Sequence, residues 1–371
     1  MHRVRNWGSF LQAFALKRIV EEFGHTCYFL DIRPSGGAGH NEKDPTRRRW
    51  WSSPIARDLR KLLKGSLSGK FLTTFLGMWY RKSFFSRYDN KFLPILNVGK
   101  MYNYDGKYDL VIIGSDEIFN IIQPETQWYK TLHVFGEEIN ARSIVTYAAS
   151  FGHTTLADLE SANLEEKISQ ALKKLTMLCV RDSNSYDIIK QLTGNAPELC
   201  VDPVFIYDFG NLIPKKISYE NYIIVYSYPG RIKDPSAIRV IKKYASVHNK
   251  MCISLFGYYD WCDKSIIPRS PFELLRFFAN TDCVLTDTYH GTIFSIKYRK
   301  NFCTIVRDNN RQKLTHLLQH MNLIDRIAYN EDDISVQLST PINYSKIDSM
   351  LEVEVKKSLA YLSKAMHSMN T

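Results

Sequence analysis

The chain has 371 residues, of which 44% are hydrophobic and 13% aromatic, so it is long enough for two domains with ordinary apolar cores. This composition excludes a disordered chain, and the longest strongly apolar stretch, residues 71–80, is too short to span a bilayer. No signal-peptide core follows the N-terminus, and seven scattered cysteines lack metal-ligand spacing. We therefore expect a cytoplasmic protein with reduced cysteines and no metal site.

Positive charge is concentrated in residues 41–100. This stretch holds 14 Lys or Arg and 4 Asp or Glu, an excess of +10 in a chain of formal net charge +11. Basic and apolar residues alternate from Arg47 onwards, which suits peripheral contact with an anionic membrane, here the inner membrane surface, or with a lipid diphosphate. A solvated insertion explains the pattern equally well. No nucleic-acid recognition motif accompanies the charge, so we expect no nucleic-acid partner.

The first half of the chain predicts alternating helices and strands. Residues 6–23 have helical apolar spacing and stop at Gly24, and residues 35–100 have the character of a basic insertion. Strands are expected at 27–32, 108–120, 143–152, 177–182 and 199–203, with helices near 156–174 and 183–192. A doubly wound domain normally opens with a strand. We therefore expect the natural first strand of this domain to be missing from the chain.

The second half repeats the pattern. Strands are expected at 222–228, 251–256, 283–287 and 302–306, with helices at 235–248, at 271–280 and after His290. The segment 345–366 predicts an amphipathic closing helix. The sequence thus predicts an α/β fold of two Rossmann-like parallel-sheet domains facing a cleft, as in GT-B proteins. Their expected bounds are 1–205 and 206–325, followed by a tail over 326–371.

Polar segments follow five of the predicted strands. The carboxyl ends of parallel strands share one edge of a sheet, where ligands bind. The five segments are GSDEIFN (114–120), YAASFG (147–152), VRDSNS (180–185), VDPVF (201–205) and TDTYHGT (286–292).

Together with RNWGSFLQAFAL (5–16), these segments resemble the motifs of the polysaccharide pyruvyl transferase family in order and spacing, up to about residue 326. The family patterns are NYGSxLQ, GSDQxWN, YAASFG, VREDS, DP and TDSFHGT. The chain departs from them at Trp7, Glu117, Phe119, Asp182, Thr288 and Tyr289. It also lacks the arginine that some relatives carry before the motif histidine.

The resemblance implies transfer of a pyruvyl unit from phosphoenolpyruvate to sugar hydroxyls, with release of phosphate. It implies no cofactor beyond phosphoenolpyruvate as donor substrate. The acceptor would be a sugar or a lipid-linked glycan in polysaccharide or exopolysaccharide biosynthesis. An anionic donor calls for arginines and helix N-termini, and ketal formation calls for general acid–base groups.

Given the resemblance, His290 and Asp116 are the candidate catalytic residues, and Arg181 is the leading ligand for the anion. A turn histidine, an Asx turn and a structural Arg–Asp pair are the alternative readings of these three positions. Asp287 is a candidate to orient His290, Ser9 is a candidate contact for sugar or phosphate, and Asp202 with Pro203 is interpreted as a domain-joining turn. The remaining candidate substrate-binding residues are Gly291, Thr292, Thr288, Ser115, Asn120, Asn6, Gly8, Gln12, Ser150, Arg307 and Arg311.

Two other functions remain open at this point. The same architecture serves GT-B glycosyltransferases that use a nucleotide sugar, and a degenerate site would leave a non-catalytic carbohydrate-binding protein.

Overall fold

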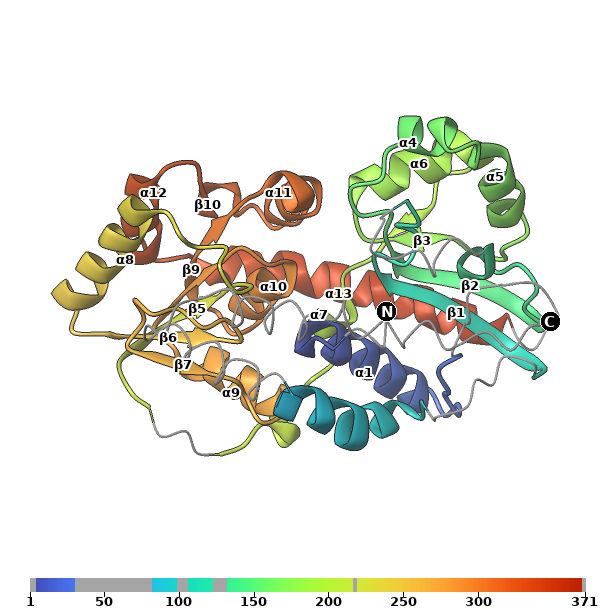
Figure 1. The fold of residues 1–371 in the computed structure, drawn as a ribbon. Helices are drawn as coiled ribbons and strands as arrows, with labels where there is room; N and C mark the ends of the chain where they lie inside the picture. The colour runs from blue at the N-terminus through green and yellow to red at the C-terminus, as the bar shows by residue number, and fades with distance from the viewer. Residues whose placement is uncertain (1–4, 31–81, 99–105, 123–131, 216–218, 369–371) are drawn as a thin grey trace, which may run out of the picture.

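Two α/β units, each built on a parallel sheet, make up the fold (Figure 1). The computed structural model describes residues 5–30, 82–98, 106–122, 132–215 and 219–368, and all structural statements refer to these. The predicted α/β class with two parallel sheets is confirmed.

The first unit has a four-stranded sheet in the order β1-β2-β3-β4. The long strands β1 and β2 pair along their length, from Tyr108 opposite Ala141 to Asp116 opposite Ala149. Its strands are β1 (Tyr108–Asp116), β2 (Ala141–Ala149), β3 (Cys179–Val180) and β4 (Glu198–Leu199). Its helices are η5 (Leu132–Phe135), α4 (Leu156–Ser161), α5 (Glu165–Lys173) and α6 (Ser183–Thr193).

The second unit has a six-stranded sheet in the order β10-β9-β8-β5-β6-β7. Its strands are β5 (Tyr222–Tyr226), β6 (Met251–Leu255), β7 (Lys264–Ile266), β8 (Cys283–Thr286), β9 (Asn301–Ile305) and β10 (Ile327–Ala328). Its larger helices are α8 (Pro235–Val247), α9 (Pro271–Asn280), α10 (Tyr289–Lys297), α11 (Arg311–His320) and α12 (Glu331–Ser339). The short elements are η7 (Asp308–Asn310) and η8 (Ile324–Arg326), with α7 (Pro203–Ile206) and η6 (Gly210–Leu212) in the segment between the two sheets.

Helix α1 (Trp7–Glu22) is apolar on most of its surface, so it must be covered on several sides. It contacts β1 of the first unit, α7 in the segment between the two sheets, and α9 of the second unit. Phe84, Tyr88 and Phe92 from the segment 82–98 surround Trp7, with ring centroids 4.9 to 5.4 Å away. This aromatic packing holds the start of α1 between the two units. The segment includes η2 (Tyr88–Phe92) and η3 (Leu93–Leu96).

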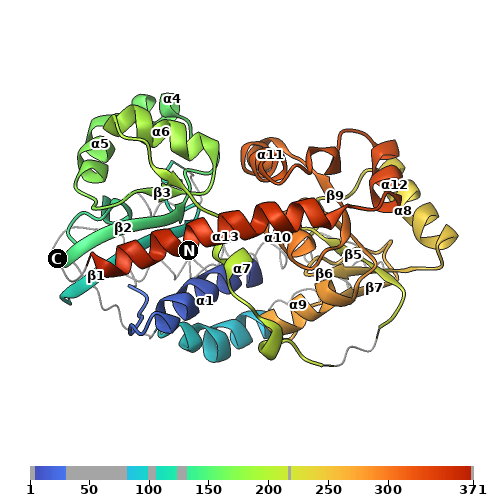
Figure 2. The ribbon, with the colours of Figure 1, turned by 180° about the vertical axis from the view of Figure 1, so that it is seen from behind.

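The closing helix α13 (Tyr344–His367) runs behind both units (Figure 2). Ile347 belongs to the core that contains the second sheet. At the other end, the Tyr361 hydroxyl donates to the carbonyl of Thr146, and the Ser358 hydroxyl accepts from the N–H of Val201. The predicted amphipathic helix is therefore present, and it straps the two units together.

Several predicted elements differ from the structure. The strand expected at 27–32 is wrong over 27–30, which form no strand: no strand among the described residues pairs with them, and the Cys27 carbonyl accepts from the Asn97 side chain. Residues 31–32 lie outside the described ranges. The helix expected near 156–174 is two helices, because Asn163 adopts φ 55° between α4 and α5. Strands β7 and β10 had no prediction.

The domain bounds at 205 and 325 stay predictions. Strand β10 and helix α12 lie beyond residue 325, yet β10 pairs with β9 and α12 packs against α8. The body of the second unit thus continues into the segment assigned to the tail.

Most of the basic stretch 41–100 lies outside the described residues, so the membrane-contact prediction concerns a part of the chain that the structure leaves undescribed. None of the helices in the described ranges is long and apolar enough to cross a lipid bilayer. All seven cysteines are described, form no disulfide, and five of them are buried.

Candidate active site

His290 lies in the first turn of α10, directly after the buried strand β8. The helix begins at Tyr289, one residue before His290 and not after it as predicted, because the Thr288 hydroxyl caps it by accepting from the N–H of Gly291 at 3.0 Å. The cap fixes where the imidazole leaves the helix. It also places His290 at the edge of the second sheet that faces α1.

Gln12 of α1 links His290 to the first unit. Its amide nitrogen donates to the carbonyl of Ser115 at 3.3 Å, so its Oε1 faces His290 Nε2 at 3.1 Å and Arg181 at 3.4 Å. An amide oxygen only accepts hydrogen bonds, so neutral His290 carries its proton on Nε2. Nδ1 then holds the lone pair and is the nitrogen that gains a proton.

Gly8 allows His290 to approach α1. A Cβ at this position would lie 2.5 Å from His290 Cγ and 2.6 Å from Nδ1, closer than side-chain carbons tolerate. Any larger residue at position 8 would displace the imidazole or the helix.

Arg181 lies between two carboxylates. Its guanidinium is 3.3 Å from Asp116 and 3.3 Å from Asp202, and its side chain is 2% exposed. Arg181 and Asp202 follow β3 and β4, and Asp116 is the last residue of β1, so parallel pairing in the same sheet brings the three groups together. The Tyr289 ring from α10 packs on Arg181 at 4.3 Å, and burial raises the pKa of this phenol, which keeps it neutral.

Asp116 has a strained backbone, with φ 95° in a region that favours glycine. Its carboxylate accepts from the Ser9 hydroxyl at 3.1 Å and from the N–H of Glu117 at 3.0 Å. Burial alone would raise the pKa of Asp116, but the charge of Arg181 and the hydrogen bond from the N–H of Glu117 outweigh it and hold the pKa below its ordinary value. Asp116 is therefore ionised at neutral pH.

Burial lowers the pKa of His290, despite the opposing effects of Asp202 and Asp116. The imidazole is consequently neutral in this state. An ionised carboxylate and a neutral imidazole thus lie in one network that reaches across both units.

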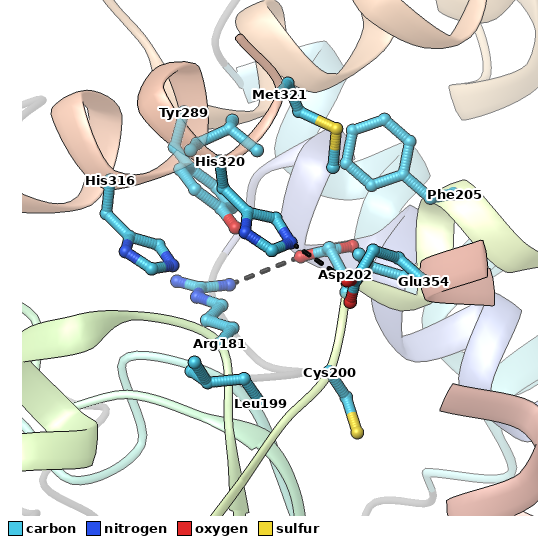
Figure 3. A pocket seen from close by; sticks show the side chains of 12 residues that line it. Arg181, Leu199, Cys200, Asp202, Phe205, Tyr289, His316, His320, Met321 and Glu354 are labelled. Atoms are coloured by element: carbon cyan, nitrogen blue, oxygen red, sulfur yellow. Dashed lines mark hydrogen bonds and ion pairs between the residues drawn. The ribbon is translucent and has the colours of Figure 1, made fainter. Parts of the chain in front are cut away.

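A small cavity of about 20 Å³ lies beside Arg181 (Figure 3). Tyr289, His316 and His320 line it from the second unit, Asp202 lines it as well, and His320 Nε2 is 3.5 Å from Glu354. Its volume is too small for phosphoenolpyruvate.

The structure gives other predicted residues local structural roles. Asn6 caps α1 and donates to the Tyr228 hydroxyl at 2.8 Å. Asn120 donates to Glu117 at 3.0 Å and accepts from Thr154 at 2.8 Å. The Ser150 hydroxyl accepts from the N–H of Gly152. The bonds of Asn120 and Ser150 brace the loops after β1 and β2.

The N–H groups of Gly291 and Thr292, predicted to bind an anion, both donate to Thr288. An anion at this helix start would have to displace the cap. Arg311 forms an exposed pair with Asp308 and does not join the network.

Asp287 does not orient His290. Its carboxylate accepts from Arg307 at 2.7 Å and lies 3.6 Å from Arg231. The carboxylate is fully buried, whereas both arginine side chains are about one-third exposed. These arginines follow β9 and β5, so two part-exposed cations lie at the ligand-binding edge of the second sheet.

Sequence reasoning missed three participants. Asp202 was interpreted as a domain-joining turn, and its Asp-Pro pattern does cap α7, but the carboxylate also reaches Arg181. Tyr289 and Arg231 were not assigned. Tyr289 lies inside a recognised motif, which was the available signal, whereas nothing in the sequence marked Arg231. Within the described ranges, no three His, Cys, Asp or Glu side chains group as metal ligands.

Three solved structures are similar in fold. The first is a mutant O-GlcNAc transferase of Thermobaculum terrenum, with 11% identity and a TM-score of 0.35. The match covers 64% of this chain and 50% of that transferase, so this chain spans about half the length of the transferase. A protein named as a UDP-N-acetylglucosamine 2-epimerase of Listeria monocytogenes has 13% identity over 66% and 68%, with a TM-score of 0.39. A glycosyltransferase of kitacinnamycin has 8% identity over 96% and 94%, with a TM-score of 0.43. All three TM-scores are below 0.5, so these likenesses carry no conclusion about mechanism.

A search of curated proteins returns no match. The family model for polysaccharide pyruvyl transferases, by contrast, matches residues 6–309, a range that contains every residue of the network around His290. On this match over most of its length, the chain belongs to the polysaccharide pyruvyl transferase family.

Proposed function

We propose that the protein transfers the pyruvyl group of phosphoenolpyruvate to hydroxyls of a sugar in glycan biosynthesis and releases phosphate. One observation supports this most: Asp116, Arg181, Gln12 and His290 come from four separate motifs and from both units, yet they form one hydrogen-bonded network. A purely structural role for each motif would not require an ionised carboxylate and a neutral imidazole in the same network.

In this proposal Asp116 is the base for the first step. It takes the proton of the attacking sugar hydroxyl, the oxygen bonds to C2 of phosphoenolpyruvate, and the electrons of the C2–C3 double bond take a proton from His290 at C3. The donor is a polyanion, so its binding raises the pKa of His290 and charges Nδ1 before this step.

The second step closes the ketal. A second sugar hydroxyl bonds to C2 and gives its proton to the now neutral His290. Phosphate leaves with the electrons of its bond to C2 and takes the proton held by Asp116. Both groups return to their starting protonation states, and the two hydroxyl protons are accounted for by the methyl group and the phosphate.

The charge of the donor needs cations other than Arg181, which two carboxylates already neutralise. Arg231 and Arg307 are part-exposed, and they share the single carboxylate of Asp287, three residues before His290. We assign them to the donor phosphate or carboxylate. A planar guanidinium suits either group.

Incubation with phosphoenolpyruvate and a panel of nitrophenyl and lipid-linked sugars tests the function. Acceptor-dependent phosphate release, with an acceptor mass gain equal to pyruvate less water, is the expected result. Asp116→Asn and His290→Gln abolish it, whereas the exposed carboxylate variant Asp348→Asn does not. Release of a nucleoside diphosphate from nucleotide sugars, without turnover of phosphoenolpyruvate, would instead identify a glycosyltransferase.

A further inference from the structure

A second, much larger cavity separates the two units on the side of α6 and α11. Its volume is about 530 Å³, within the range of roughly 300–1,000 Å³ found for small-molecule sites. Helix α6 of the first unit and helix α11 of the second form its two walls, and they face each other in Figure 1. We call it the α6–α11 cleft.

Four of the side chains that line this cleft are polar and uncommitted. Gln312, Thr315 and Gln319 are spaced three and four residues apart, so they share one face of α11. Asp187 faces them from α6. Within the described residues none of these four side chains makes a hydrogen bond or an ion pair. They offer amide donors and acceptors, a hydroxyl and a carboxylate to whatever enters the cleft.

The aromatic ring of Tyr329 also lines the α6–α11 cleft. Tyr329 lies just after β10 and is 74% exposed. A tyrosine joins a flat apolar ring to a polar hydroxyl, and both are suited to a sugar ring, which presents C–H faces and hydroxyl edges.

The charge of the cleft favours a neutral ligand. Arg311 lines it but pairs with Asp308 at 3.2 Å, and Asp187 contributes one negative charge. A phosphorylated donor would meet no cluster of uncommitted cations here. The part-exposed arginine pair lies elsewhere, at Asp287.

The cleft adjoins the network around His290. His316 of α11 lines both the cleft and the small cavity beside Arg181. Lys313 of the same helix pairs with Glu117, the neighbour of Asp116. On the opposite wall, Asn184 donates to the carbonyls of Gly152 and Thr154, in the loop after β2. A chain of sugar rings in the cleft would therefore have one end close to the reacting groups.

We propose that the α6–α11 cleft is the acceptor subsite, which binds neutral sugar rings of a glycan, with Tyr329 as the stacking platform and Gln312 and Gln319 as hydrogen-bonding groups. The assignment rests on the proposed pyruvyl transfer for its catalytic meaning, but it predicts glycan binding in its own right.

Binding is tested on the whole chain by ligand-observed NMR, without phosphoenolpyruvate, using nitrophenyl glycosides of common hexoses and N-acetylhexosamines and short oligosaccharides of each. The best-bound sugar is expected to lose roughly tenfold or more in affinity on Tyr329→Ala and on Gln312→Ala/Gln319→Ala. The matched surface variants Tyr28→Ala and Gln170→Ala should bind like the parent. Equal affinity in parent and cleft variants, or no binding by the parent, overturns the proposal.

Kinetics separates this inference from the proposed function. With phosphoenolpyruvate present, the cleft variants are expected to raise KM for the acceptor while KM for phosphoenolpyruvate stays unchanged. Phosphate release by the cleft variants with an unaltered acceptor KM would refute the cleft assignment but not the proposed function. Tyr329-dependent sugar binding without any phosphate release would support the cleft assignment and refute the proposed function.

Discussion

Replacing Arg181 by methionine is expected to be much more damaging to folding than replacing either of its carboxylate partners. The native network contains one guanidinium and two carboxylates within 3.3 Å of it. Arg181→Met leaves two negative charges buried without a partner, whereas Asp116→Asn leaves one positive and one negative charge. The asymmetry follows from this count of charges and not from the distances, which are equal.

The magnitudes follow from the geometry. At 3.3 Å and an effective dielectric constant of about 20, each charge contact contributes about 5 kcal/mol before desolvation is subtracted. Breaking a buried pair by removing one partner typically costs about 3–5 kcal/mol, and Arg181→Met should lie at the upper end. Asp116→Asn retains an amide oxygen that accepts from Arg181, so we expect a cost of about 1–2 kcal/mol.

Urea unfolding at pH 7 measures these free energies. The exposed pair Arg299–Asp348 is the matched control, and Arg299→Met should lower the free energy of unfolding by no more than about 1 kcal/mol. The double variant Arg181→Met/Asp116→Asn should be more stable than Arg181→Met alone, because one unpaired carboxylate remains in place of two. The deficit of Arg181→Met should shrink towards pH 4, where buried carboxylates without the arginine take up protons. An Arg181→Met cost no larger than that of Asp116→Asn would refute the charge-balance reasoning.

Three further predictions concern single groups. Gly8→Ala should leave the chain folded but lower turnover, since the added carbon would lie 2.5 Å from His290 Cγ. Thermal melting measures the stability of the variant, and phosphate release measures its turnover. Full activity would contradict the close contact between position 8 and His290. The pKa of His290 is lowered from 6.5 in the folded protein, so the unfolded chain binds a proton at this imidazole more readily. The free energy of unfolding should therefore fall as the pH drops below 6.5. In urea titrations between about pH 5 and 7, His290→Gln should show a smaller fall than the parent. Burial lowers the pKa of Lys297 to about 8, so the charged ammonium opposes folding at neutral pH. Between pH 8 and 10.5 the parent should therefore gain stability relative to Lys297→Met. If the difference in unfolding free energy between parent and variant stays constant over this range, the pKa of Lys297 is not lowered.

Strand ends were predictable from the sequence because their signal is local. Buried apolar runs followed by polar residues placed Asp116, Arg181 and His290 at sheet edges, and parallel pairing then brings such ends together. The partners of these groups were not predictable. Asp202 carries the local pattern of a helix cap, and only the adjacency of β3 and β4 aligns it with Arg181. Gln12 was recognised within a motif, but its contact with His290 depends on how α1 lies between the two units.

Two of the short strands escaped prediction for a similar reason. Strands β7 and β10 have three and two residues and lack the apolar run that marked the equally short β3 and β4, and they exist because a longer neighbour supplies their pairing partners. The start of α10 was placed two residues too late because Thr288, read as a departure from the family pattern, is the residue that caps it.

The contacts that join the two units are concentrated around the proposed chemistry. His290 meets Gln12, Tyr289 covers Arg181, and Lys313 pairs with Glu117 beside Asp116. A ligand that changes the charge on His290 must therefore also change the free energy of the contact between the units. The α13 strap joins them away from these groups, through Tyr361 and Ser358, and it keeps them together whichever way those contacts shift.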